Sequence, residues 1–405
     1  MDVTVRARAV AIGRPIAYVL GGLLAITLYG LAIWQAPEFL VNRDVLSRAT
    51  PEQRLPAEHN ARLIVISVGG ALVVGTGLLY TARNYRLAHR GQVTERFTKA
   101  LERLGSDELY VRIGGVHALE HVMRDSPEHR GDVVKVLVAF IRDRLPRRGT
   151  EAANETPWMH PPSGSDEPEL PAEPAPDVQA ALTALGSRPE QTKHNRASLN
   201  FRQLHVQGVQ LSGAQFRKAD LRGADLRNAD LFEADLQNAD LSGANLQNAY
   251  LSEANLQNTN LSEANLQNAN LSGANLQNAN LHGADLQNTH LFGADLQNAR
   301  LSGADLQNAD LREANLQKAR LRGADLQKAD LRKANLQSTH LRGANLQKAD
   351  LHGANLQNAD LHGTNLSLAS LTAEQLRQAA LSEHTILPEG LARGPLGEIW
   401  EKNLS

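Results

Sequence analysis

The chain has no cysteine, few aromatic residues and almost no net charge, and each shortage excludes a class of protein. Without cysteine there can be no disulfide framework, iron–sulfur cluster, cysteine zinc site or thiol nucleophile. Aromatic residues make up only 4% of the chain, so leucine and alanine must supply the packing. A formal net charge of −2 over 405 residues argues against binding or mimicking nucleic acid by bulk electrostatics, so local charge has to be considered separately.

Charged residues are also missing from two stretches near the N-terminus. No charge occurs between Arg14 and Glu38, and the apolar core of this stretch is 16–34; a second apolar stretch is 63–82. About twenty residues at roughly 1.5 Å each are enough to cross the roughly 30 Å hydrocarbon layer. We therefore expect two transmembrane helices, with the lipid bilayer as a partner. A cleaved signal peptide is the alternative for the first stretch, and a buried core helix for the second.

The distribution of arginine and lysine indicates the orientation of this hairpin. Three arginines precede the first stretch, whereas the four arginines between the stretches are spread over a longer segment. Six basic residues closely follow the second stretch: Arg83, Arg86, Arg90, Arg96, Lys99 and Arg103. The bias predicts a two-pass protein of the cell membrane, with both termini in the cytoplasm and residues 35–62 outside.

Residues 92–145 show helical periodicity in three short segments, 92–104, 111–123 and 132–145, which predicts a small helical unit next to the membrane. The segment His117-Ala-Leu-Glu120-His121 matches the H-x-x-E-H pattern of a class of zinc proteases. Such a site needs a third protein ligand and a cleft, and no convincing third ligand presents itself. We therefore expect two surface histidines here, and no catalytic, metal or cofactor site.

Proline is concentrated in one part of the chain. Nine of the sixteen prolines fall between Pro146 and Pro189, among Glu, Ala and Ser, and this composition cannot bury enough surface to fold alone. We expect a flexible linker over 146–176 that gives the following domain reach. Asp177 then looks like the N-cap of a short helix that ends at Gly186.

A five-residue repeat fills the second half of the chain. From Phe201 to Leu371 every fifth residue is apolar and nearly always leucine, within the pattern Ala-[Asp/Asn]-Leu-x-x. A period of five would wind the leucines around an α-helix, and would alternate them between the two faces of a strand. The chain must therefore turn with every repeat so that each leucine points at a common axis, which is a solenoid.

This segment closely resembles the pentapeptide-repeat proteins. The resemblance implies a mainly β fold, a right-handed quadrilateral β-helix with four pentapeptides per coil and with leucine and the residue two before it pointing inward. About nine coils would make a rod of about 40 Å at a strand spacing of roughly 4.8 Å. Phe201 and Phe216 replace leucine in the first coil, and we expect these larger side chains to plug that end.

The outward positions show a second period, of ten residues, with glutamine after alternate leucines from 237 to 357. Stacked neighbours should lie twenty residues apart. Gln237, Gln257 and Gln277 should then form an amide ladder that hydrogen-bonds along the stack. A second ladder, which includes Gln247 and Gln267, should lie on the opposite face.

Charge is uneven along the predicted rod. Residues 228–299 hold eight acids and no Lys or Arg, whereas residues 300–348 hold ten Lys or Arg against five acids. Within this basic band Arg312 and Arg332 should stack on one face, and Arg322 and Arg342 on the opposite one. These four arginines are the candidate partner-binding residues, although solvated surface variation explains such a band equally simply.

The whole arrangement resembles membrane pentapeptide-repeat proteins of the actinobacterial type. The resemblance is carried by Arg112-Ile-Gly-Gly-Val-His-Ala-Leu-Glu120 and by Asp177-Val-Gln-Ala-Ala-Leu-Thr-Ala-Leu-Gly186. The expected segments are a cytoplasmic tail (1–15), a transmembrane helix (16–34), an external loop (35–62), a second transmembrane helix (63–82), the helical unit (83–145), the linker (146–176), a cap helix with its lead-in (177–195), the β-helix (196–371), and a C-terminal cap and tail (372–405).

No activity follows from this resemblance, and no repeat residue looks catalytic, so we do not expect an enzyme. The main hypothesis is a membrane-anchored scaffold that presents a rigid rod to a cytoplasmic protein partner; a homodimer is left open. The alternative is DNA-mimic protection or inhibition of a type II topoisomerase, an activity known among soluble pentapeptide-repeat proteins. Residues 196–371 carry 17 acids against 16 Lys or Arg, whereas mimicry needs a strongly anionic surface.

Overall fold

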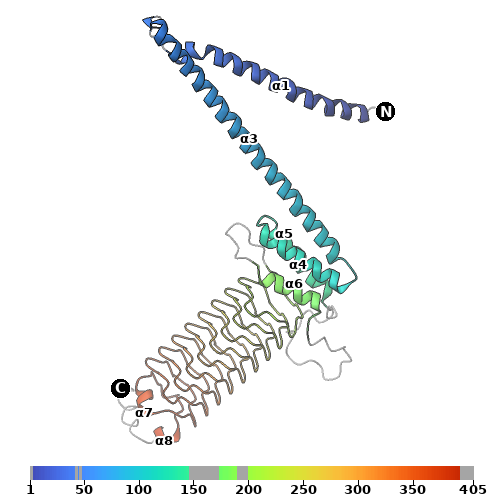
Figure 1. Ribbon diagram of the computed structural model, residues 1–405. Coiled ribbons are helices and arrows are strands. Elements are labelled where there is room, and N and C mark those ends of the chain that lie inside the picture. Colours follow the sequence, from blue (N-terminus) through green and yellow to red (C-terminus); the bar gives the residue numbers. More distant parts are fainter. Residues whose placement is uncertain (1–2, 42–43, 45–47, 146–172, 189–198, 393–405) are drawn as a thin grey trace. The chain divides into compact units, whose positions relative to one another are not determined.

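The computed structural model describes residues 3–41, 44, 48–145, 173–188 and 199–392, and the chain divides into two compact units, Met1–Gln92 and Val93–Ser405 (Figure 1). Most of the expected linker, the lead-in to the rod and the C-terminal tail lie outside the described residues.

The first unit consists of α1 (Val3–Leu40) and the N-terminal part of α3 (Pro51–Leu104). Since α1 ends at Leu40 and α3 begins at Pro51, the segment expected as an external loop is helical over most of its length. The Gly21–Leu40 part of α1 and the helix α3 are each long and apolar enough to cross a membrane. Only 11% and 6% of the residues in their apolar windows are buried, so the described chain leaves these surfaces uncovered.

The two long helices touch where a tyrosine meets a glycine. The hydroxyl of Tyr29 donates to the carbonyl oxygens of Val65 and Ile66, at 3.3 and 3.1 Å. The tyrosine ring lies against Gly69, at a place where any Cβ would collide with it. The absence of a side chain at Gly69 therefore lets α1 and α3 approach closely at this level.

The second unit begins within α3, so the short helix expected over 92–104 is the C-terminal part of that long helix. Two helices follow at the predicted places, α4 (Leu109–Asp125) and α5 (Arg130–Arg144), and α6 (Pro176–Gly186) comes after the linker. The three segments expected as helices in 92–145 are thus helical, but the first does not stand alone.

Helices α4, α5 and α6 share one hydrophobic core with the first coil of the rod. Val178, Leu182 and Leu185 of α6 are buried in that core. Arg142 of α5 donates to the carbonyl and side-chain oxygens of Asn200, at 3.1 and 2.7 Å. Both ends of the linker therefore belong to the same unit. The reach predicted from its proline content is wrong, because the rod is packed directly onto the helices.

Asp177 does not cap α6, contrary to the prediction. The N-cap is Ala175 and the helix begins at Pro176, so Asp177 lies in the first turn. Its buried carboxylate instead accepts a hydrogen bond from Nε of Arg112 at 2.6 Å. Arg112 also donates from Nη1 to the carbonyl oxygens of Ser106 and Asp107, at 3.1 and 2.7 Å. The two motifs that flank the linker thus supply the two halves of one buried ion pair.

The repeat folds into coils of twenty residues. Parallel bridges join residues twenty apart at every fifth position, from Asn200 with Asp220 to Asp350 with Ser370. This register confirms four pentapeptides per coil. Each bridge is a single residue pair, and no extended strand occurs among the described residues. The sides of the coil are therefore single-residue ladders, seen as the stacked turns in Figure 1.

The bore of the rod is filled by leucine and alanine. All leucines at the repeat position from Leu221 to Leu366 are at most 5% exposed. The second residue after each central leucine has a positive φ, as at Asn248 with φ 56°; glycine tolerates this conformation best, and asparagine better than most other residues. In the first coil, the rings of Phe201 and Phe216 meet edge to face at 5.7 Å, and both are buried, which confirms the predicted plug.

The last coil is covered by a short helix, α7 (Ala373–Arg377), at the start of the segment expected as the C-terminal cap. A capping box joins Thr372 and Gln375. Leu376 is fully buried, and the amide of Gln375 donates to the carbonyl oxygens of Leu351 and Ala354, at 2.7 and 2.9 Å. Backbone acceptors at the open end of the rod are thereby satisfied. The helix α8 (Glu389–Ala392) follows.

Candidate binding groove

The twenty-residue register places outward side chains in rows along the rod, with a step of roughly 4.8 Å per coil. The predicted amide ladder forms where neighbours in a row are both glutamine and no aspartate competes. Gln247 donates to Gln267 at 2.8 Å, and Gln257 to Gln277 at 3.3 Å. Where an aspartate stands nearby, the amide donates to it instead, as Gln267 does to Asp285 at 2.6 Å. Most amides of these rows are therefore bonded within the rod, but among the described residues the expected bond between Gln237 and Gln257 does not form.

Arg312 and Arg332 lie in one row, and the rod itself neutralises them. Arg312 binds Asp310 through two hydrogen bonds of 2.8 and 2.7 Å, and Arg332 binds Asp330 through bonds of 2.8 and 2.5 Å. The next carboxylates along the row lie 3.6 Å from Arg312 and 3.7 Å from Arg332. The hydrogen bond from Arg312 lowers the pKa of Asp310, which keeps that carboxylate charged.

Arg322 and Arg342 lie in a different row, half a coil away from the first pair. Both side chains are exposed, and among the described residues neither has an ion-pair or hydrogen-bond partner. The residue two before each arginine explains the contrast. Asp310 precedes Arg312, but Arg320 precedes Arg322 and His340 precedes Arg342.

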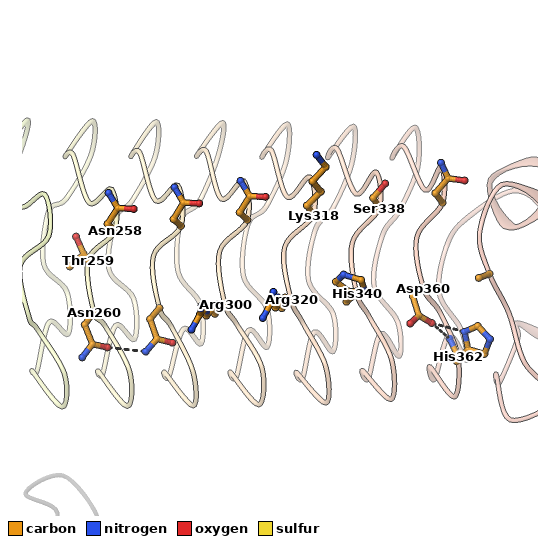
Figure 2. Close-up of a pocket in the computed structure, with 15 residues that line it drawn as sticks. Asn258, Thr259, Asn260, Arg300, Lys318, Arg320, Ser338, His340, Asp360 and His362 are labelled. Carbon is orange, nitrogen blue, oxygen red and sulfur yellow. Dashed lines mark hydrogen bonds and ion pairs between the residues drawn. The ribbon is translucent and has the colours of Figure 1, made fainter.

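An open groove of about 1030 Å³ runs along the rod beside this unpaired row (Figure 2). One wall is the row Asn258, Asn278, Asn298, Lys318, Ser338 and Asn358. The other wall is the row Asn260, Asn280, Arg300, Arg320, His340 and Asp360. Figure 2 shows Arg300, Arg320 and His340 on successive coils, with Lys318 on the facing wall.

We call the cationic part of this surface the basic groove, defined by Arg300, Lys318, Arg320, Arg322 and Arg342. Over the coils that carry these five side chains, the two walls and the row of Arg322 contain no acid until Asp360 is reached. All five acids of residues 300–348 lie in other rows: Asp305, Asp310, Glu313, Asp325 and Asp330. The net positive charge of the basic band is therefore concentrated on one side of the rod.

Asp360 lies at one end of the basic groove, and its carboxylate is already hydrogen-bonded to His362. Burial is the largest single influence and raises the pKa of Asp360, but the hydrogen bonds with His362 and the positive charges of His362 and Arg342 together lower it overall. Among the described residues none of the five cations of the basic groove has an ion pair within 4 Å, and all five are exposed; Arg342 acts on Asp360 only at longer range.

Sequence reasoning treated the four candidate arginines as equivalent, and the structure separates them. Arg322 and Arg342 each lie two residues after a wall residue of the groove, Arg320 and His340, whereas Arg312 and Arg332 are held by aspartates. The candidate residues predicted from the sequence did not include Arg300, Lys318 and Arg320. Two features of the sequence indicate the groove. Arg300, Arg320 and His340 are spaced twenty residues apart, which places them in one row, and the residue two before Arg322 and two before Arg342 is not an acid.

The H-x-x-E-H motif on α4 has other interactions. Glu120 accepts hydrogen bonds from Arg124 at 2.8 Å and from Ser187 at 3.2 Å. His117 is exposed, with Nδ1 3.5 Å from Glu120, and His121 lines a separate hollow of about 330 Å³ between α3 and α4. Within the described parts of the chain, no three His, Cys, Asp or Glu side chains are grouped so that they could hold a metal ion.

Comparison with known proteins identifies the repeat. The sequence model of a family described as Pentapeptide repeats matches in eight copies, over residues 200–327 and 334–372. A comparison with curated proteins gave no match.

Solved structures similar to this chain include HetL, a pentapeptide repeat protein involved in heterocyst differentiation regulation from the cyanobacterium Nostoc sp. strain PCC 7120. It is 35% identical, the match covers 47% of this chain and 86% of HetL, and the TM-score is 0.28. A second pentapeptide repeat protein from Nostoc PCC 7120 is 33% identical over 29% of this chain and 79% of its own, with a TM-score of 0.22. Full-length QnrB1, a plasmid-mediated fluoroquinolone resistance protein, is 18% identical over 51% of this chain and 99% of its own, with a TM-score of 0.30.

Proposed function

We propose, starting from the fact that the chain belongs to the pentapeptide-repeat family, that it is a membrane-anchored scaffold of the actinobacterial type. In this proposal α1 and α3 cross the cell membrane, both termini lie in the cytoplasm, and the rod presents a binding surface to a protein partner. The scaffold is not an enzyme and uses no cofactor.

The observation that carries the proposal is the basic groove. Five exposed cations without an ion pair within 4 Å are gathered there, whereas most other charged side chains of the rod are paired or hydrogen-bonded. Lys328 and Lys348, which also lack a partner among the described residues, stand in a separate row. The bore is filled with leucine and alanine, so the rod has no interior site for a substrate. A rigid surface with one unsatisfied charged side suits binding of a macromolecule.

The anchor is supported by the apolar surfaces of α1 and α3, which the described chain leaves uncovered. Six basic residues follow the second apolar stretch within about twenty residues, and such an excess favours the cytoplasmic side. Because α3 continues into the core of the second unit, where Ala100 and Leu104 are buried, the rod would lie on that same side.

The test is proximity labelling in the native host, with the labelling enzyme fused after Ser405 of the full-length chain. We expect the fusion in the membrane fraction and a reproducible set of labelled cytoplasmic proteins. The matched control is the same fusion lacking residues 1–92, which should lose the membrane fraction. Labelling of external proteins would overturn the orientation, and a fusion found only in the soluble fraction would overturn the anchor.

The alternative, inhibition of a type II topoisomerase, is supported only by the acidic stretch of residues 228–299. In the structure the eight acids of this stretch lie on all four sides of the coil: Asp230, Glu233, Asp235, Asp240, Glu253, Glu263, Asp285 and Asp295. A DNA mimic needs its charge along one side. The full-length protein in detergent should therefore leave DNA supercoiling by gyrase unchanged; inhibition near equimolar protein would favour the alternative.

A further inference from the structure

We infer that the basic groove binds a short, extended acidic segment of the protein partner, with the carboxylates of that segment against Arg300, Arg320, Arg322 and Arg342. This inference rests on the proposed function and gives the partner a chemistry. It also selects one side of the rod and a small set of residues, where the sequence alone offered a whole basic band.

The first argument is that the rod leaves these cations unpaired in a place where it could have paired them. In the opposite row each arginine follows an aspartate by two residues, and the two form a bidentate pair, as Arg312 does with Asp310. At the equivalent positions of the groove the aspartate is replaced by Arg320 and His340. Successive coils are only about 5 Å apart, so the cations that they carry repel each other. Anions bound between them would relieve that repulsion.

The second argument is the composition of the facing wall. Asn258, Asn278 and Asn298 are exposed, and their side chains have no hydrogen-bond partner among the described residues. Each amide offers both donors and an acceptor. Asn298 stands beside Arg300, whereas Asn258 and Asn278 stand beside Asn260 and Asn280 on the preceding coils. A peptide that extends past Arg300 could therefore bond its backbone groups to these asparagines while its carboxylates reach the arginines. This division of tasks favours a peptide over a simple inorganic anion.

The third argument concerns size. The distance from the coil of Arg300 to the coil of Arg342 is two steps of roughly 4.8 Å, or about 10 Å. An extended peptide rises about 3.3 Å per residue, so three or four residues span this distance. The cations thus match an acidic segment of about three or four extended residues.

Nucleic acid fits this surface less well. Sequence-independent binding of single strands uses aromatic side chains on which bases stack, and no Phe, Tyr or Trp is among the residues that line the groove. Duplex binding depends on many phosphate contacts along a long basic surface, whereas this one has five cations within about 10 Å. Nucleic acid is therefore an outcome to be tested and is not our proposal.

The experiment measures binding of a fluorescein-labelled peptide, Gly-Ser-Glu-Glu-Glu-Glu-Glu-Glu-Gly-Ser, to the full-length protein in phosphatidylcholine nanodiscs by fluorescence anisotropy. The comparison probes are the same peptide with glutamine in place of every glutamate, and a single-stranded 20-nucleotide DNA. The test variant is Arg320→Ser with Arg322→Ser. The matched control is Arg312→Ser with Arg332→Ser, which removes the same charge from the opposite side of the rod.

We expect the glutamate peptide to bind and the glutamine peptide not to bind. The test variant should weaken binding at least tenfold, and the control variant should change it less than twofold. Circular dichroism should show both variants folded, because none of the four arginines is buried. Equal loss in both variants would mean that only net charge matters, and would overturn the inference. Tighter binding of the DNA, or no binding of the glutamate peptide, would overturn it as well.

The failure of this inference can be distinguished from the failure of the proposed function. If the peptide does not bind but the labelling experiment still finds cytoplasmic partners at the membrane, and Arg320→Ser with Arg322→Ser does not change them, the scaffold stands and the groove does not. If the peptide binds but the chain is not in the membrane, the groove stands and the anchored scaffold does not.

Discussion

Replacing Asp177 by asparagine should detach α6 from α4 while the middle of the rod stays folded. The side chains of Arg112 and Asp177 are only 11% and 2% exposed, and their hydrogen bond is 2.6 Å long. The substitution keeps the size of the side chain but removes its charge. Arg112 would then be a buried cation held only by two carbonyl oxygens, those of Ser106 and Asp107.

The magnitude follows from the cost of an uncompensated buried charge. Removing one partner of a buried ion pair destabilises the structure by about 3–5 kcal/mol. Since about 1.4 kcal/mol corresponds to a factor of ten, the local opening equilibrium should rise by roughly two to three and a half powers of ten. In a repeat protein each coil depends mainly on its neighbours, so the effect should fade within a few coils of the cap.

Hydrogen exchange followed by mass spectrometry on the full-length protein in nanodiscs measures this directly. Amides in 177–188 and 201–225 should exchange faster by that factor in the Asp177→Asn variant, and amides in 260–300 should be unchanged. The matched control is Asp143→Asn on α5, where the aspartate is exposed. A variant with Arg112→Leu and Asp177→Leu should recover much of the protection, because an apolar pair replaces the ions. Exchange of 177–188 within threefold of the parent protein in Asp177→Asn would refute this account of how the cap is held.

Three further outcomes follow from the rod. Ala274→Leu should overpack the bore, where Ala274 is fully buried, and should lower the free energy of unfolding by about 1–3 kcal/mol in a thermal melt; an unchanged melting temperature would contradict the filled bore. Thr339→Ala should change the free energy of unfolding by only about 0.5 kcal/mol. Alanine is the usual residue at this position, and the carbonyl of Leu316 keeps its hydrogen bond from the backbone N–H of Ala319; a loss above about 2 kcal/mol would contradict this. Since the hydrogen bond from Arg312 lowers the pKa of Asp310 in the folded state, this pair stabilises the rod above the ordinary aspartate pKa of about 4 and ceases to do so as the pH falls through the lowered value. Melts between pH 7 and pH 3 should therefore show a smaller acid-induced loss in Arg312→Gln, and equal losses would argue that the pair contributes nothing.

The architecture of the rod could be predicted from the sequence because one local rule repeats. A leucine every five residues allows only a chain that turns with each repeat, and the family resemblance supplied four repeats per coil. The bridge between Asn200 and Asp220, and every bridge up to Asp350, has that register. The sequence did not indicate that each side of the coil pairs through only one residue.

The packing of the helical cap could not be predicted, because it depends on a contact between distant residues. Arg112 and Asp177 are 65 positions apart, and each stands in a motif that was noticed on its own. Nothing in the composition of the intervening linker shows that its two ends meet. An aspartate before a helical run looks like an N-cap, and only the packing of α6 against α4 reveals its actual partner.

The basic groove was half predicted. The uneven charge of 300–348 is visible in the sequence, and so is the twenty-residue register once four repeats per coil are assumed. The remaining distinction is whether a cation has an acid beside it within the same coil, and the sequence shows this as well. Asp310-Leu-Arg312 and Arg320-Leu-Arg322 differ by one residue, yet the first is a closed pair and the second leaves both side chains unpaired.

The coil of twenty residues and the sequence unit of ten have a consequence for how such an array can grow. Inserting one ten-residue copy leaves the leucine spacing intact, so the packing of leucine and alanine in the bore is unchanged. Every outward side chain beyond the insertion, however, is carried halfway around the coil relative to the helical cap. A copy of twenty residues restores the original direction. The number of ten-residue copies between the cap and Arg300, odd or even, therefore sets the side on which the basic groove opens, and a duplication that stability cannot detect can redirect it.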